Sequence, residues 1–154
     1  MKKFTIIICI LFANYAFCST YEVSKKIDKF SLFNQFDKKI TIDEDIKYML
    51  VSFEKNSSET INSFIEENKG FLTKNNTVFI VNISKMPSII LKMFAIPKMR
   101  SFKHNILLVY DEKNNNFKEK QNFITLYKLD KLVVKKIDFL ESKEDLQRVF
   151  NENK

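Results

Sequence analysis

The sequence predicts a three-layer α/β domain, in which helices flank a central mixed β-sheet and a β-hairpin stands at the N-terminal side. Residues 48–53 and 77–83 are nearly continuous apolar runs, as expected for strands that are covered on both faces. A helical pattern lies between them, and strand, helix and strand in this length imply a parallel pair with a right-handed crossover. Residues 29–42 predict the hairpin, because two short apolar runs flank a polar turn near Asp37-Lys38-Lys39.

The first helix is expected to begin near Ser57 or Ser58, either of which can cap it by accepting a hydrogen bond from a free backbone N–H. Gly70 is the one glycine of the chain, and it stands where a helix end commonly needs a left-handed residue. The buried face of this helix is predicted to contain Ile61, Phe64 and Ile65, with Leu72 continuing it.

A second helix is expected after the second strand, because Ser84 and Pro87 suit a helix start. Its predicted buried face consists of Ile89, Ile90, Met93 and Phe94. Pro97 is expected to break or kink it. Downstream, the pattern predicts a strand over residues 105–111, an antiparallel hairpin around Leu129-Asp130 and a closing helix over residues 141–152.

The first 18 residues have the pattern of a secretory signal peptide. Lys2 and Lys3 precede an apolar run over residues 4–12, and Ala16-Phe17-Cys18 places small residues at both cleavage-recognition positions. The run is shorter than the roughly 20 residues that span a bilayer. We therefore expect export to a bacterial periplasm, a cleaved segment 1–18 and one domain over residues 19–154 without a stable membrane span. An uncleaved N-terminal anchor is the alternative.

Cleavage would remove both cysteines of the chain, Cys9 and Cys18. The remaining domain could then form no disulfide, thiolate nucleophile or cysteine-ligated metal site. The segment also contains two of the 26 basic residues and none of the 19 acidic ones, which leaves 24 against 19 and a formal net charge of +5. A charge of this size, with both signs interspersed, suits an acidic partner or an anionic surface and does not indicate nucleic-acid binding.

The order of elements resembles the thioredoxin superfamily and, within it, the peroxiredoxin-like redoxins. "FSLFNQFDKKITI" resembles the N-terminal hairpin of the redoxins, and "YMLVSFEKNSS" resembles the first core strand with the active-site turn that follows it. "ILLVYDEKNNNFKEKQNFITLYKLDKLVVKKIDF" is similar to their strand, acidic turn, loop and closing hairpin. The resemblance covers residues 30–150 and implies a thioredoxin-like fold.

The chain departs from that family at its redox centre. The family's redox cysteine would fall near residues 55–60, and its usual cis-proline would fall near Gln121-Asn122, but neither residue type occurs there. A serine hydroxyl forms neither a sulfenic acid nor a mixed disulfide, so thiol–disulfide exchange and peroxide reduction are not expected. The sequence therefore predicts a redox-inactive binding or accessory module with no catalytic residue, metal or cofactor of its own.

The candidate ligand site combines the turn Asn56-Ser57-Ser58 with Gln121-Asn122. Free N–H groups and the helix dipole at a helix N-terminus can hold an anion or a carboxylate. If the fold brings Gln121 and Asn122 alongside, the five residues would form a small polar pocket for a protein, a peptide or a small ligand. Ordinary helix capping is the alternative for Ser57 and Ser58.

A flavin- or metal-dependent oxidoreductase is the alternative function. Similar short exported chains are sometimes labelled FAD/FMN-containing dehydrogenases, but a dinucleotide fingerprint needs several closely spaced glycines and Gly70 stands alone. Thioether and imidazole groups suit Cu(I), and the chain offers a loose series of them. These residues are Met86, Met93, Met99 and His104.

Overall fold

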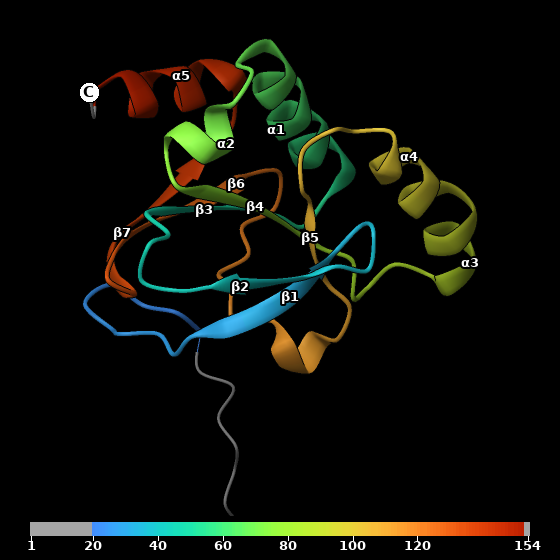
Figure 1. Cartoon of the computed structure of the whole chain (residues 1–154), viewed down its shortest axis with the longest axis horizontal. Coiled ribbons are helices and arrows are strands. Elements are labelled where there is room, and N and C mark those ends of the chain that lie inside the picture. Colours follow the sequence, from blue (N-terminus) through green and yellow to red (C-terminus); the bar gives the residue numbers. More distant parts are fainter. Residues whose placement is uncertain (1–19, 153–154) are drawn as a thin grey trace, which may run out of the picture.

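The computed structural model describes residues 20–152, so the expected signal peptide lies outside the described residues. The described chain forms a seven-stranded mixed sheet (Figure 1). Its strands are β1 (Phe30–Asn34), β2 (Lys39–Ile42), β3 (Tyr48–Ser52), β4 (Thr77–Asn82), β5 (Leu107–Val109), β6 (Ile124–Asp130) and β7 (Val133–Leu140). They lie in the order β2-β1-β5-β4-β3-β6-β7, and β3–β4 and β4–β5 are the parallel pairs. The predicted mixed sheet, parallel pair and N-terminal hairpin are confirmed.

The helices follow the predicted order along the chain. Between β4 and β5 the chain forms one continuous helical segment, residues 88–100, whose middle part is wound as a π-helix. The helical elements are α1 (Lys55–Glu67), α2 (Phe71–Lys74), α3 (Ser88–Ile90), the π-helix η1 (Leu91–Ala95), α4 (Ile96–Arg100), the 3-10 helix η2 (Glu112–Asn114) and α5 (Lys143–Glu152).

Two hydrophobic cores lie on the two faces of the sheet. On one face, α1, α2 and α5 pack with Leu50 of β3 and with inward residues of segment 88–100. Met49 and Val51 of the same strand belong to the other core, because successive side chains of a strand point to opposite faces. That second core is covered by the hairpin and by Phe117 from the loop after β5. In Figure 1, α1, α2 and α5 lie together above β3 and β4, and the hairpin strands β1 and β2 of the same sheet lie below them.

Helix α1 begins earlier than predicted. Its N-cap is Glu54, which makes no side-chain capping bond, so Ser57 and Ser58 lie inside the first turn and the capping prediction is wrong. A capping side chain must precede the helix to reach its free N–H groups. Gly70 does adopt the left-handed conformation, with φ of 78°, but it is the N-cap of α2, and the C-cap of α1 is Asn68.

The predicted buried face of segment 88–100 is also wrong. Ile89, Ile90, Met93 and Phe94 are 69%, 46%, 65% and 62% exposed. Leu91 and Ile96, five residues apart, pack against the core instead. A π-helix pairs residues at i and i+5, so its wider turn moves the inward face away from the stripe that 3.6-residue periodicity predicts.

Pro97 neither ends the helix nor separates it into two. It occupies the first turn of α4, directly after the π-helix, and the chain stays helical to Arg100. Proline lacks an N–H, and its ring collides with the carbonyl four residues earlier in a regular α-helix. The π-helix immediately before it provides the wider winding that accommodates such a residue.

Candidate functional site

Three serine hydroxyls form a closed cluster where β3 leads into α1. The Oγ of Ser52, which is fully buried, lies 2.8 Å from Ser57 Oγ and 2.7 Å from Ser58 Oγ. Ser52 and Ser57 also lie within hydrogen-bond distance of the Glu54 carbonyl oxygen, at 3.0 and 3.1 Å. The hydroxyls therefore bind one another and the backbone. Ser57 is buried, whereas Ser58 is partly accessible.

The other predicted site residues lie near the start of α1. Asn56, Gln121 and Asn122 are exposed. The backbone N–H of Asn122 donates to Glu54 Oε1 at 3.4 Å, so the loop before β6 approaches the N-cap of α1. Asn122 has a left-handed φ of 66°, and the described residues contain no cis peptide bond. This contact runs through Glu54, and a shared pocket of the five residues stays a prediction.

An apolar groove of about 350 Å³ lies between α1 and segment 88–100. Sequence reasoning missed it, because it assigned Ile90 and Phe94 to the core. Figure 1 shows segment 88–100 standing out from the sheet beside α1. The groove is lined by Phe53, Glu54, Lys55, Ser58, Glu59, Asn62, Val81, Asn82, Met86, Ile90, Phe94, Ala95, Lys98, Met99 and Phe102.

Asn82, at the end of β4, lines the groove and has a side-chain nitrogen without a hydrogen-bond partner among the described residues. It is 8% exposed, and its Oδ1 accepts from the backbone N–H of Ser84 at 2.9 Å. Ser84 Oγ lies 2.6 Å from the same oxygen and 2.6 Å from Glu112 Oε2, and this second bond is the main cause of the lowered pKa of Glu112. Asn82 Nδ2 is buried and has no hydrogen-bond partner among the described residues.

His104 is outside the groove lining, and its side chain and backbone contact other parts of the fold. Its Nε2 lies 2.8 Å from Asn62 Oδ1, and its carbonyl accepts from Gln35 Nε2 at 2.8 Å. Burial lowers the pKa of His104, and the carboxylate of Glu66 opposes that shift. Asn62 in turn donates to the Ser58 carbonyl at 2.9 Å. The Asn62 amide thus links His104 to the first turn of α1. The His104 ring bonds this amide and not a serine hydroxyl, so it is not placed to activate a serine.

The residues considered as copper ligands lie in different surroundings. Met86 and Met99 line the groove, Met93 is exposed on the outer side of its helix, and His104 contacts Asn62. Across residues 20–152, no group of three or more histidine, cysteine, aspartate or glutamate side chains is placed to hold a metal ion.

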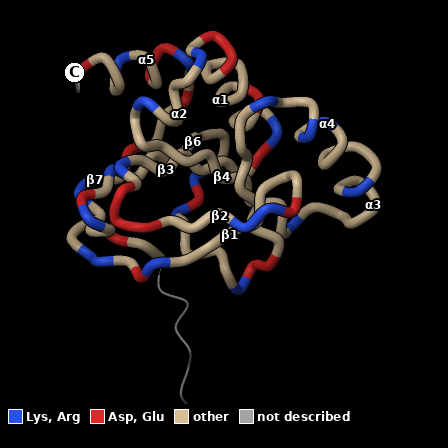
Figure 2. Tube along the Cα trace, in the orientation of Figure 1, with Lys and Arg blue, Asp and Glu red and all other residues tan. Residues whose placement is uncertain are grey.

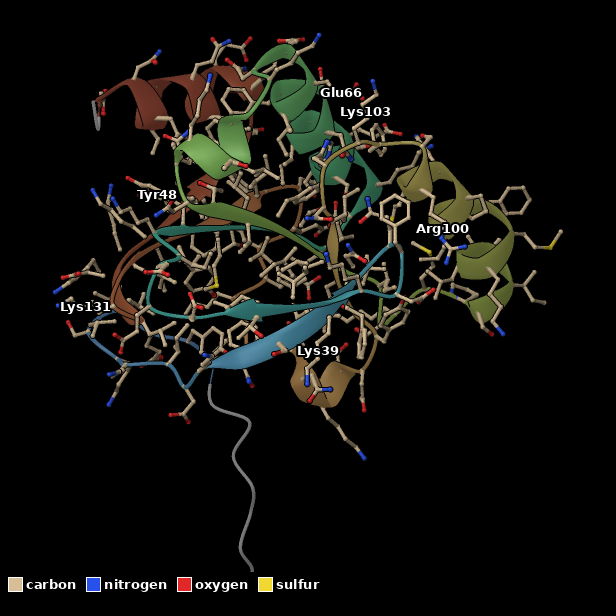
Figure 3. All side chains as sticks on the ribbon, in the orientation of Figure 1. Lys39, Tyr48, Glu66, Arg100, Lys103 and Lys131 are labelled. Atoms are coloured by element: carbon tan, nitrogen blue, oxygen red, sulfur yellow. The ribbon has the colours of Figure 1, made fainter. Side chains whose placement is uncertain are left out.

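The hairpin turn is tied to α4 by Arg100, which lies next to that turn in Figure 3. Its Nε donates to the Gln35 carbonyl at 2.7 Å, and its guanidinium group lies 2.9 Å from Asp37 Oδ2. Gln35 itself is buried, and its Oε1 accepts from the Ile106 N–H at 2.8 Å. These contacts hold one wall of the groove on the sheet.

The structural comparisons identify the fold as thioredoxin-like. The thioredoxin domain of a thiol-disulfide oxidoreductase from Bacteroides vulgatus superposes with a TM-score of 0.57 at 12% identity, over 87% of this chain and 99% of that one. A peroxidoxin from Mycobacterium tuberculosis has a TM-score of 0.56 at 12% identity, over 85% and 95% of the two chains. A peroxiredoxin-like protein from Aquifex aeolicus has a TM-score of 0.56 at 10% identity, over 86% of each.

The resemblance predicted from the order of elements is therefore confirmed at the level of the fold. No family model matches the sequence, and no curated protein matches it. Within residues 20–152, no helix has the length and apolar character needed to cross a membrane.

Proposed function

We propose that this thioredoxin-like chain is a redox-inactive binding module of the periplasm, which holds a polypeptide segment in the groove between α1 and segment 88–100. The observation that carries the proposal is an open apolar groove beside residues 55–60, where a redoxin would have its reactive cysteine. Residues 20–152 contain no cysteine. A partner that binds there would be held by contact, because thiol exchange has no sulfur to use.

The side chains of the groove suit an apolar polypeptide segment. Ile90 and Phe94 line it and are 46% and 62% exposed, which is unusual for two large apolar residues in one groove. Met86 and Met99 line the same groove, and methionine is flexible enough to pack against side chains of different shapes. Asn56, Ser57, Ser58, Gln121 and Asn122 are proposed as the polar end of the site.

The flavin- or metal-dependent alternative predicts a bound group. The protein, purified from a periplasmic extract, would show flavin absorption or retain a metal after dialysis. A colourless protein without bound metal, whose first residue is Ser19, supports the binding module and its export. Bound flavin or copper would replace the proposal with the oxidoreductase.

The direct test measures binding of a permanently unfolded polypeptide, reduced and carboxymethylated α-lactalbumin, by isothermal titration calorimetry. We expect the wild-type domain to bind it and the double variant Ile90→Ser/Phe94→Ser to lose that binding. Val23→Ser/Phe139→Ser is the matched control, because both residues are exposed hydrophobics outside the groove lining. Equal binding by the two double variants, or none by the wild type, would refute the proposal.

A further inference from the structure

We infer that Asn82 binds a backbone carbonyl of the polypeptide segment in the groove, through its free Nδ2 donor. The inference rests on the proposed function and adds the polar contact that orients the bound segment. The apolar side chains of the segment would lie against Ile90 and Phe94, and one carbonyl oxygen would face Asn82.

The orientation of the Asn82 amide follows from its neighbour. The Ser84 backbone N–H can only donate, so the Asn82 atom that lies 2.9 Å from it must be the oxygen. The amide nitrogen, with two N–H groups, is therefore on the other side. An exchange of the two atoms would place a donor against a donor and lose the contact.

A buried donor of this kind is rarely left without an acceptor. Most buried side-chain polar atoms in proteins have a partner, and an exception calls for an explanation such as a ligand or a bound water. Asn82 is more than nine-tenths buried and lines the groove. An acceptor atom of a bound molecule would therefore supply the missing hydrogen-bond partner of Nδ2. Met86 and Met99 line the same groove, and their flexible side chains can move to admit that acceptor.

The charges of the groove favour a neutral acceptor. Lys98 lies 2.7 Å from Glu59 Oε1, so this pair is neutral as a unit. Lys55 and Glu54 add one charge of each sign to the lining. A carboxylate or a phosphate would meet two acidic side chains without an excess of basic ones, whereas a peptide carbonyl brings no charge. In Figure 2, both basic and acidic positions lie in the region between the α1 and α4 labels.

Asn82→Asp is the variant that removes the amide donor, and it also adds a negative charge when the new carboxyl group is ionised. Aspartate keeps an oxygen for the Ser84 N–H and replaces the amide nitrogen by a second oxygen, which cannot donate when ionised. We expect it to bind carboxymethylated α-lactalbumin about tenfold more weakly than the wild type does. Ser84→Ala is the matched control: it removes the hydroxyl beside Oδ1, leaves Nδ2 in place and should bind within about twofold of the wild type.

The outcomes separate this inference from the proposed function. Wild-type binding that Asn82→Asp leaves unchanged would overturn the role of Asn82 while the groove remains the binding site. No binding by the wild type would overturn both.

A second measurement needs no variant. In ¹⁵N-correlated NMR spectra of the wild-type domain, the Asn82 side-chain amide protons should shift downfield and exchange more slowly with solvent when the unfolded probe saturates the groove. The side-chain amide of Asn75, whose nitrogen already donates to the Phe71 carbonyl at 2.9 Å, is the internal reference. Asn82 amide signals that stay unchanged at saturation would refute the inference.

Discussion

The side-chain nitrogen of Lys98 lies 2.7 Å from Oε1 of Glu59, so that an ion pair joins α4 to α1 beside the groove. Both side chains are about half exposed. The hydrogen bond from Lys98 is the main reason that the pKa of Glu59 is lowered. The pair connects the two walls at the surface, whereas buried polar groups hold each wall on the sheet.

Glu59→Gln should leave the urea midpoint of unfolding unchanged within measurement error. An exposed ion pair gains little, because water and salt screen it and both long side chains lose freedom when they pair. The measurement is urea unfolding at low and at high salt, with Lys98→Gln as the partner variant. A clear loss of stability at both salt concentrations would contradict this view of the pair.

Ser52→Ala should lower the free energy of unfolding by about 1–3 kcal/mol, because it removes a fully buried hydroxyl together with its hydrogen bonds to Ser57, Ser58 and the Glu54 carbonyl. The Ser52 hydroxyl is fully buried and contacts both Ser57 and Ser58. Ser58→Ala is the control and should cost less, since Ser58 is partly accessible and Ser52 retains Ser57. Equilibrium denaturation measures the free energy of unfolding of both variants. Equal losses of stability would show that Ser52 is not the centre of the cluster.

Phe94→Ala should change stability by less than about 1 kcal/mol, although phenylalanine is among the residues most often found in cores. Phe94 is 62% exposed and has little packing to lose. Phe79→Ala, at a fully buried position of β4, should cost about 3–5 kcal/mol. Thermal unfolding of the two variants measures both losses of stability. Similar losses would mean that the Phe94 side chain is buried in solution.

Gln35→Ala should destabilise the fold by more than about 2 kcal/mol, because several buried groups lose their partners at once. Gln35 donates to the His104 carbonyl and accepts from the Ile106 N–H. The change can be measured by urea unfolding, together with hydrogen exchange of the Ile106 amide, which should become faster. Thr41→Ala, which removes the exposed hydroxyl that contacts Ser31, is a control on the same hairpin and should have a small effect.

Stability should decrease as the pH falls from about 6.5 through the folded-state pKa of His104. Burial lowers that pKa, so the unfolded chain takes up the proton first and is favoured as the solution becomes more acidic. The stability due to neutral His104 is therefore fully present above the unfolded pKa. Urea unfolding of the wild type and His104→Gln between pH 5 and 8 tests this, and parallel curves would contradict it.

The order of elements could be predicted from the sequence because it depends on local patterns. The apolar runs of β3 and β4, the polar turn of the hairpin and the left-handed Gly70 are each specified by residues close together in the chain. The departure from the redoxins is equally local: the only cysteines are Cys9 and Cys18, so residues 55–60 contain none. These features predicted a thioredoxin-like fold, which the structure has.

Only the tertiary structure decided what the second helix presents to solvent. Ile90 and Phe94 lie on an apolar stripe that suits a core face, but the π-helix turns Leu91 and Ile96 inward instead. Asn82 ends an ordinary buried strand, and nothing in its neighbours along the chain predicts an unmatched Nδ2. Periodicity determines which residues can share a face, whereas the winding of the helix and the contacts between distant segments determine which face is left open.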